Sequence, residues 1–240
     1  MRRLDELYLL CPTWGSRKVA AMLHNEGSPV NRKRVQRLRA LMGLETIYRA
    51  PRLSVPGSLA GRFPYLLRGM SITRPNAVWC ADITYIPMAR GFLYLFAVMD
   101  WASRRILAWE ISNTLETEFC LVGLESALQV AGCAPGIFNT DQGTQFTSLE
   151  WVQKLQSKGI AVSHDGKGRW RDNVLIERYW RSLKYDDIYP KSYENGRKLH
   201  HGLEAYHHLY NHVRPHAALD NLTPARAYAL PAVRPAKVVD

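Results

Sequence analysis

Three acidic residues, far apart along the chain, are of the types that two-metal phosphoryl transfer requires. Asp82 lies in the run AVWCADITYIPM, Asp141 follows the apolar run GIFNT, and Glu177 lies in DNVLIERYWRSLK. Hard divalent cations prefer oxygen ligands, and two neighbouring ions need carboxylates that can bridge them. Asp82 is flanked by apolar residues, where a charge is costly unless it is paired or bound to metal. The alternative is that Asp82 pairs with a buried arginine or caps a backbone turn.

Other acids compete for the third position. Asp165 and Asp172 flank a glycine-rich basic stretch, and Asp172, or Asn173 after it, is placed to cap the helix that follows. Glu177 is favoured because it lies within that helix, seven residues before Lys184. Asp100 comes directly before WASRR, where capping of a turn is the ordinary explanation.

A sheet and its helices must position these acids, and the periodicity predicts both. Three strands are expected first, then a helix, a strand, a helix and a strand, which is the order of an RNase H-like α/β fold with a mixed five-stranded sheet and flanking helices. In that fold the first and fourth strands are neighbours, which would bring Asp82 beside Asp141. The expected strands are 77–88, 91–100, 104–112, 134–141 and 160–164, and the expected helices are 115–132, 149–159, 172–186, 192–213 and 222–230.

A strongly basic balance is the second feature of the chain. Its 240 residues include 32 Lys and Arg against 21 Asp and Glu, for a net charge of +11, and residues 1–50 contribute more than half of that excess. Such a surface favours a polyanion, usually nucleic acid. Composition alone also fits a ribosomal or a membrane-surface protein.

Two short helices separated by a turn are predicted in the basic region. Ser16 is placed to cap a helix over 16–26, and Asn31 to cap a helix in NRKRVQRLRALMGL. A helix, a glycine-containing turn and a basic helix form the helix-turn-helix pattern. The alternative is a solvated basic helix that packs on another part of the protein. The basic side chains expected to face outward are Arg32, Lys33, Arg34, Arg37 and Arg39, and the first four are the predicted DNA contacts.

The helix at 172–186 carries Glu177, Arg181 and Lys184 at spacings that share one face. Arg181 and Lys184 are therefore also predicted to contact DNA, with Lys184 holding a phosphate near the acids. An exposed lysine with a partner on its own helix is the alternative for Lys184.

Several classes of function find no support. Four cysteines without CxxC spacing indicate neither a zinc site nor a disulfide framework, and they fit a reducing cytoplasm. The histidine pairs at 200/201 and 207/208 have no cysteine at ligand spacing, so a polar helix face is expected. The sequence has no GxSxG elbow, no phosphate loop ending in Lys-Ser or Lys-Thr, no signal peptide and no apolar run long enough to cross a bilayer.

These motifs, in this order, resemble the OrfB-type transposases of bacterial insertion sequences, which are DDE recombinases related to retroviral integrases. The resemblance rests on the three acids and on WCADITYI, TDQGTQF, DNVLIERYWRSLK and YNHVRPHAAL, and it covers residues 12–230. It implies that Asp82, Asp141 and Glu177 are catalytic and hold Mg²⁺ or Mn²⁺, with two ions. Lys184 corresponds to a basic residue that the family carries at this position.

The implied reaction is metal-dependent strand cleavage at the ends of the element, followed by transfer of the freed 3′-hydroxyl to another phosphodiester. Asn211, Arg214 and His216 in the last motif are expected to be structural or to contact DNA. Two alternatives stay open: another RNase H-like nuclease or integrase, and a catalytically inactive DNA-binding relic.

The expected organisation has four parts: a helix-turn-helix module at 1–49, a linker at 50–76, the catalytic core at 77–230 and a flexible tail at 231–240. The expected partners are DNA, both element ends and target, an upstream reading-frame product or fusion, and further copies of the chain in the DNA complex. The expected location is the bacterial cytoplasm, at the nucleoid.

Overall fold

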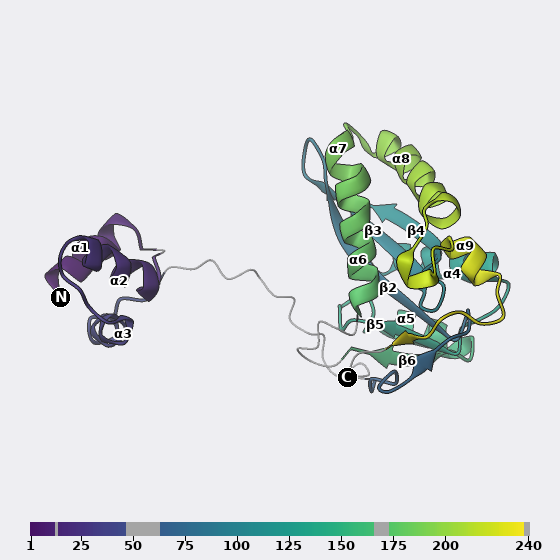
Figure 1. The fold of residues 1–240 in the computed structure, drawn as a ribbon, viewed down its shortest axis with the longest axis horizontal. Helices are drawn as coiled ribbons and strands as arrows, with labels where there is room; N and C mark the ends of the chain where they lie inside the picture. Colours follow the sequence, from purple (N-terminus) through teal and green to yellow (C-terminus); the bar gives the residue numbers. More distant parts are fainter. Residues whose placement is uncertain (13, 47–62, 166–172, 238–240) are drawn as a thin grey trace. The chain divides into compact units, whose positions relative to one another are not determined.

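The computed structural model describes residues 1–12, 14–46, 63–165 and 173–237. The chain divides into two compact units, Met1–Leu53 and Ser54–Asp240 (Figure 1). None of the described helices is both long and apolar enough to cross a membrane.

The N-terminal unit consists, in its described part, of α1 (Arg2–Leu10), α2 (Ser16–Asn25) and α3 (Arg32–Leu41). The helices enclose a small apolar core. The Asn31 cap is confirmed, because its side chain accepts from the Lys33 backbone N–H at 2.9 Å. The Ser16 cap was wrong: Gly15 holds the capping position and Ser16 is the first helical residue. α1 was not predicted from the sequence. The buried core residues are Leu4, Leu7, Val19, Leu23 and Val35.

Arg39, expected to face outward, is buried instead, with 7% of its surface exposed. Its guanidinium donates to the Trp14 carbonyl at 2.8 Å, the Leu44 carbonyl at 3.3 Å and the Thr46 hydroxyl at 3.1 Å. These acceptors replace water and make burial of the charge tolerable. Arg39 therefore ties α3 to the segments on either side of it.

In the described part of the second unit, five strands form one mixed sheet in the order β4-β3-β2-β5-β6. Strands β2 (Val78–Pro87), β3 (Phe92–Asp100) and β4 (Ile106–Ser112) are antiparallel, while β5 (Ile137–Thr140) and β6 (Ala161–His164) run parallel to β2. This confirms the predicted sheet, including the adjacency of the first and fourth strands.

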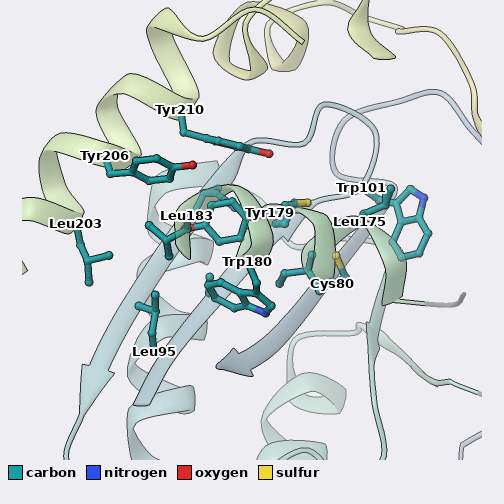
Figure 2. Packing of buried hydrophobic residues seen from close by; sticks show 14 of the residues in the cluster. Cys80, Leu95, Trp101, Leu175, Tyr179, Trp180, Leu183, Leu203, Tyr206 and Tyr210 are labelled. Carbon is teal, nitrogen blue, oxygen red and sulfur yellow. The ribbon is translucent and has the colours of Figure 1, made fainter. Parts of the chain in front are cut away.

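The sheet is covered on both faces because its strands are apolar on both sides. α4 (Glu118–Ala131) and α5 (Leu149–Ser157) pack on one face over Trp79, Phe96 and Phe138. At Gly123 α4 lies so close to the sheet that an added Cβ would be 2.6 Å from the Phe96 ring. α6 (Val174–Leu183) and α8 (Gly196–His208) cover the other face (Figures 1 and 2).

Two helices predicted as continuous end in π-helical turns. α6 passes through Lys184–Ile188 into α7 (Tyr189–Lys191), and α8 passes into Leu209–Val213. A short 3₁₀ turn, Ala217–Leu219, precedes α9 (Pro224–Tyr228). Thr223 caps α9, and its side chain accepts from the Arg226 N–H.

The described part of the expected linker packs on the core. Leu67 and Ile72 are buried, and Phe63 and Tyr65 contact the apolar clusters. β1 (Ser71–Ile72) pairs antiparallel with β7 (Ala236–Lys237), which lies within the expected tail. The predicted boundaries at 49, 76 and 230 stay predictions.

Candidate active site

Strand pairing brings the first two acids together. β2 and β5 pair in parallel with Val78 opposite Ile137 and Cys80 opposite Asn139. Continuing this register by two residues places Asp82 opposite Asp141, and neighbouring strands lie about 5 Å apart. The order of the strands thus joins two residues that are far apart in sequence.

Asp82 is half-buried, and both of its carboxylate oxygens accept hydrogen bonds. Oδ1 accepts from the Ile83 backbone N–H at 2.8 Å, and Oδ2 accepts from Nε1 of Trp180 at 2.9 Å. Burial, and then the charge of Asp141, raise the pKa of Asp82 to about 7, while the Trp180 bond acts in the opposite direction. Asp82 is thus a desolvated acid beside a like charge.

Asp141 lies at the rim, just beyond the end of β5. Although the residue is exposed, its carboxylate folds back so that Oδ1 accepts from the Gly143 N–H at 2.9 Å. A Cβ at Gly143 would lie 2.9 Å from that same oxygen, so a side chain there would have to displace the Asp141 carboxylate. Desolvation raises the pKa of Asp141, and the Gly143 bond opposes the increase.

α6 supplies the remaining predicted residues of this site. Glu177 is exposed on its first turn, and its charge contributes to the raised pKa of Asp82. Lys184 is half-buried, and burial lowers its pKa against the opposing influence of Asp82. Glu177 and Lys184 therefore both lie within electrostatic reach of Asp82. Arg181 is exposed on the same helix.

The three carboxylates are oxygen donors of the kind that hard divalent cations prefer. In the described part of the chain none of the three carboxylates forms an ion pair, and burial, followed by repulsion from Asp141 and, to a smaller extent, Glu177, raises the pKa of Asp82. A bound cation would relieve that repulsion. Within the same residues, no three His, Cys, Asp or Glu side chains are gathered tightly enough to hold an ion as they stand. The side chains would therefore have to close on the metal.

The competing acids have other roles. Asp100 is buried and accepts from the Asn76 N–H, the Ser103 N–H and the Ser103 hydroxyl, which confirms the predicted capped turn. Asp165 accepts from the Asn139 side chain at 2.7 Å. Asp172 lies outside the described residues. Asn173 holds the N-cap position of α6 without a side-chain capping bond.

The other predicted DNA contacts lie elsewhere. Arg32, Lys33, Arg34 and Arg37 are exposed on α3, in the N-terminal unit. From the last motif, Asn211 is buried and bonds to both the N–H and the carbonyl of Ile106, which favours the structural alternative.

Arg214 and His216 are also engaged within the fold. Arg214 pairs with Asp186, and His216 packs edge-on against the Tyr210 ring. The polar helix face expected for the histidine pairs is wrong for His207, which is buried: its Nε2 meets the Tyr179 hydroxyl and its ring stacks on Trp109.

Two residues beside the acids were not singled out from the sequence. Gly143 could have been found from the Asp-x-Gly spacing, which is typical of a turn closed by a carboxylate. Trp180 offered a weaker signal, an indole N–H one helical turn after Glu177.

Three family profiles match this chain. Two described as "Integrase core domain" match residues 72–169 and 158–224, and one described as "HTH-like domain" matches residues 1–52. The matches follow the two units of the structure.

Two curated relatives and one solved structure show the extent of the similarity. The transposase for insertion sequence element IS904 of Lactococcus lactis is 32% identical over 219 residues, which are 88% of this chain and 85% of the relative. The transposase for IS629 of Shigella sonnei is 31% identical, over 89% of this chain and 73% of the relative.

The catalytic core domain of HTLV-2 integrase, solved with magnesium in a dimeric form, is 19% identical. It matches with a TM-score of 0.50 over 66% of this chain and 98% of that domain, which supports the fold assignment. The pairing of β2 with β5 and the helical N-terminal unit are consistent with the matched profiles and relatives. The chain therefore belongs to the insertion-sequence transposases with an integrase core domain.

Proposed function

We propose that this chain is a DDE-type polynucleotidyl transferase that cleaves DNA strands at insertion-sequence ends and transfers the freed 3′-hydroxyl to a target phosphodiester. The observation that supports the proposal is that the β2–β5 register, extended by two residues, sets Asp141 opposite Asp82, while the charges of Glu177 and Lys184 are within electrostatic reach of Asp82. Asp82 is half-buried and is repelled by the charges of Asp141 and Glu177, and such a carboxylate is stabilised when a cation binds beside it.

Asp82 and Asp141 are the direct ligands in this proposal, and Glu177 completes the site from α6. Two Mg²⁺ or Mn²⁺ ions, when bound, would activate the attacking oxygen and stabilise the departing 3′-oxygen. The magnesium in the HTLV-2 integrase core supports the choice of cation, since that domain shares the fold. Lys184 and Arg181 hold DNA phosphates along α6, so that the scissile bond is presented to the acids.

DNA is the proposed partner of both units. In the N-terminal unit, the exposed side chains of Arg32, Lys33, Arg34 and Arg37 contact phosphates. We also propose that an upstream reading-frame product or fusion supplies recognition of the element ends, that copies of the chain assemble on DNA, and that the protein works in the cytoplasm. The module at 1–49 and the core at 77–230 are the proposed functional parts.

A strand-transfer assay tests this function against its alternatives. The chain, with any upstream partner, is incubated with labelled duplexes that carry the element ends, a target plasmid, and Mg²⁺ or Mn²⁺. Cleaved and joined products support the transposase. Cleavage without joining supports another RNase H-like nuclease, and DNA binding without either product supports an inactive relic.

A further inference from the structure

Trp180 makes a contact that the proposed reaction leaves unexplained. It lies 98 positions after Asp82 in the sequence, yet its indole Nε1–H donates to Asp82 Oδ2 at 2.9 Å. The other oxygen, Oδ1, is held by the backbone of Ile83. In the described structure, Trp180 is the side chain that donates to this carboxylate. Its bond therefore fixes the side-chain torsions that orient the Asp82 carboxyl group.

The indole is itself fixed in direction. Trp180 has 6% of its surface exposed and belongs to the apolar cluster between α6 and the sheet. Its ring lies 4.8 Å from that of Tyr179, and Figure 2 shows it extending from α6 toward the strands. A donor held by packing restrains the acceptor, because the indole cannot turn away without opening the core.

Simple burial of an indole does not explain the bond. The indole N–H groups of Trp101 and Trp151 are buried without a hydrogen-bond partner among the described residues. Burial alone therefore does not supply a tryptophan N–H with an acceptor among the described residues. The Trp180 donor meets the carboxylate at the centre of the proposed active site.

The position of Trp180 on α6 connects two acids. Glu177 precedes it by three residues, so both lie toward the same side of the helix. The helix that presents the third acid thus also holds the first acid by a direct bond. The geometry points to Trp180 as the positioning residue that orients Asp82 and sets its separation from Glu177, so that the two carboxylates are arranged for a divalent cation.

This inference rests on the proposed function, and a set of variants separates the two. Trp180→Phe removes the N–H and keeps an aromatic ring. Benzothienylalanine at position 180 replaces the N–H by sulfur and keeps the two-ring shape. Tyr179→Phe is the matched control, because it removes the neighbouring hydroxyl bond to His207 and leaves Trp180 and Asp82 in place. Asp82→Asn tests the proposed function itself.

Two readouts are needed, one of them independent of activity. Binding of Mn²⁺ to the full chain is followed by the electron paramagnetic resonance signal of the free ion, and cleavage of element-end DNA is followed in a single turnover. Loss of a hydrogen bond behind a metal ligand typically weakens metal binding or activity about 10–100-fold. We expect both position-180 variants to lose at least about tenfold in Mn²⁺ affinity and in cleavage, and Tyr179→Phe to match the wild type.

Each outcome decides the question. If Trp180→Phe fails to fold, the benzothienylalanine protein alone provides the test. If the position-180 proteins bind Mn²⁺ and cleave like the wild type while Asp82→Asn is inactive, Trp180 has no positioning role and the inference is overturned. If Asp82→Asn cleaves normally, the proposed function fails, and it fails independently of Trp180.

Discussion

Replacement of Asn211 by alanine tests whether this residue of the YNHVRPHAAL motif stabilises the fold rather than contacts DNA. Its side chain accepts from the Ile106 N–H at 3.0 Å and donates to the Ile106 carbonyl at 2.9 Å. Ile106 opens β4 beside the register shift at Val98/Met99, so the amide ties the π-helical turn after α8 to an irregular strand end. Both Asn211 and Ile106 are buried.

The magnitude follows from these two bonds. A buried polar group left without a partner costs about 1–3 kcal/mol, so losing both bonds costs about 2–6 kcal/mol. A water molecule in the vacated space would recover part of this, and we expect about 3 kcal/mol of destabilisation. For a unit of this size that corresponds to a melting temperature lower by roughly 6–12 °C.

Chemical denaturation of the full chain, followed by tryptophan fluorescence, measures the effect. DNA affinity, measured below the unfolding transition, should not change. His212→Ala, on the exposed side of the same π-helical turn, is the control and should leave stability nearly unchanged. A variant that keeps wild-type stability and loses DNA binding would refute the structural role and favour a DNA contact at Asn211.

Three further predictions concern the acids, Lys184 and partner dependence. Burial and the charge of Asp141 raise the pKa of Asp82 to about 7, above its unfolded value of about 3.9, so the protonated form favours folding. The free energy of unfolding of the metal-free protein should therefore fall as the pH rises from about 4 to about 7, and it should fall less in Asp82→Asn. An equal pH dependence of the wild type and the variant, measured in EDTA, would contradict this. Lys184→Ala should weaken DNA binding most at low salt and reduce the slope of log affinity against log salt concentration by about 1. Identical salt titrations of the wild type and the variant would disprove this. The isolated chain should prefer its terminal repeat over random duplex by less than about a thousandfold at physiological salt, and stronger selection would make an upstream partner unnecessary for recognition.

The architecture was predictable because strand and helix periods are local properties of the sequence. Residues 77–112 show the periodicity of strands, and the order of elements then implies that β2 and β5 are neighbours. The capped turn at Asp100 was also predictable, since a carboxylate before a polar turn has few other uses. The approach of Asp82 to Asp141 follows from this topology.

The remaining features depend on tertiary packing, which a periodic pattern does not contain. Arg39 lies in a basic run, which predicts an outward-facing side chain, but its guanidinium donates to backbone carbonyls from outside α3. The π-helical turns after Leu183 and His208 have no simple residue signature. Trp180 lies near Asp82 only because α6 lies on the sheet in one particular rotation. α1 begins with two basic residues, and such a start does not by itself predict a helix.

The most direct test of the central claim compares three near-isosteric variants, Asp82→Asn, Asp141→Asn and Glu177→Gln. Each removes an anionic ligand and little volume, so folding and bulk DNA affinity should be largely retained. Single-turnover cleavage of element-end DNA in Mg²⁺ or Mn²⁺, together with any upstream partner that the wild type requires, is the measurement. The account predicts that each variant loses cleavage while its circular dichroism spectrum and DNA affinity match the wild type. Near wild-type turnover in any one of them would show that this carboxylate is not part of the metal site.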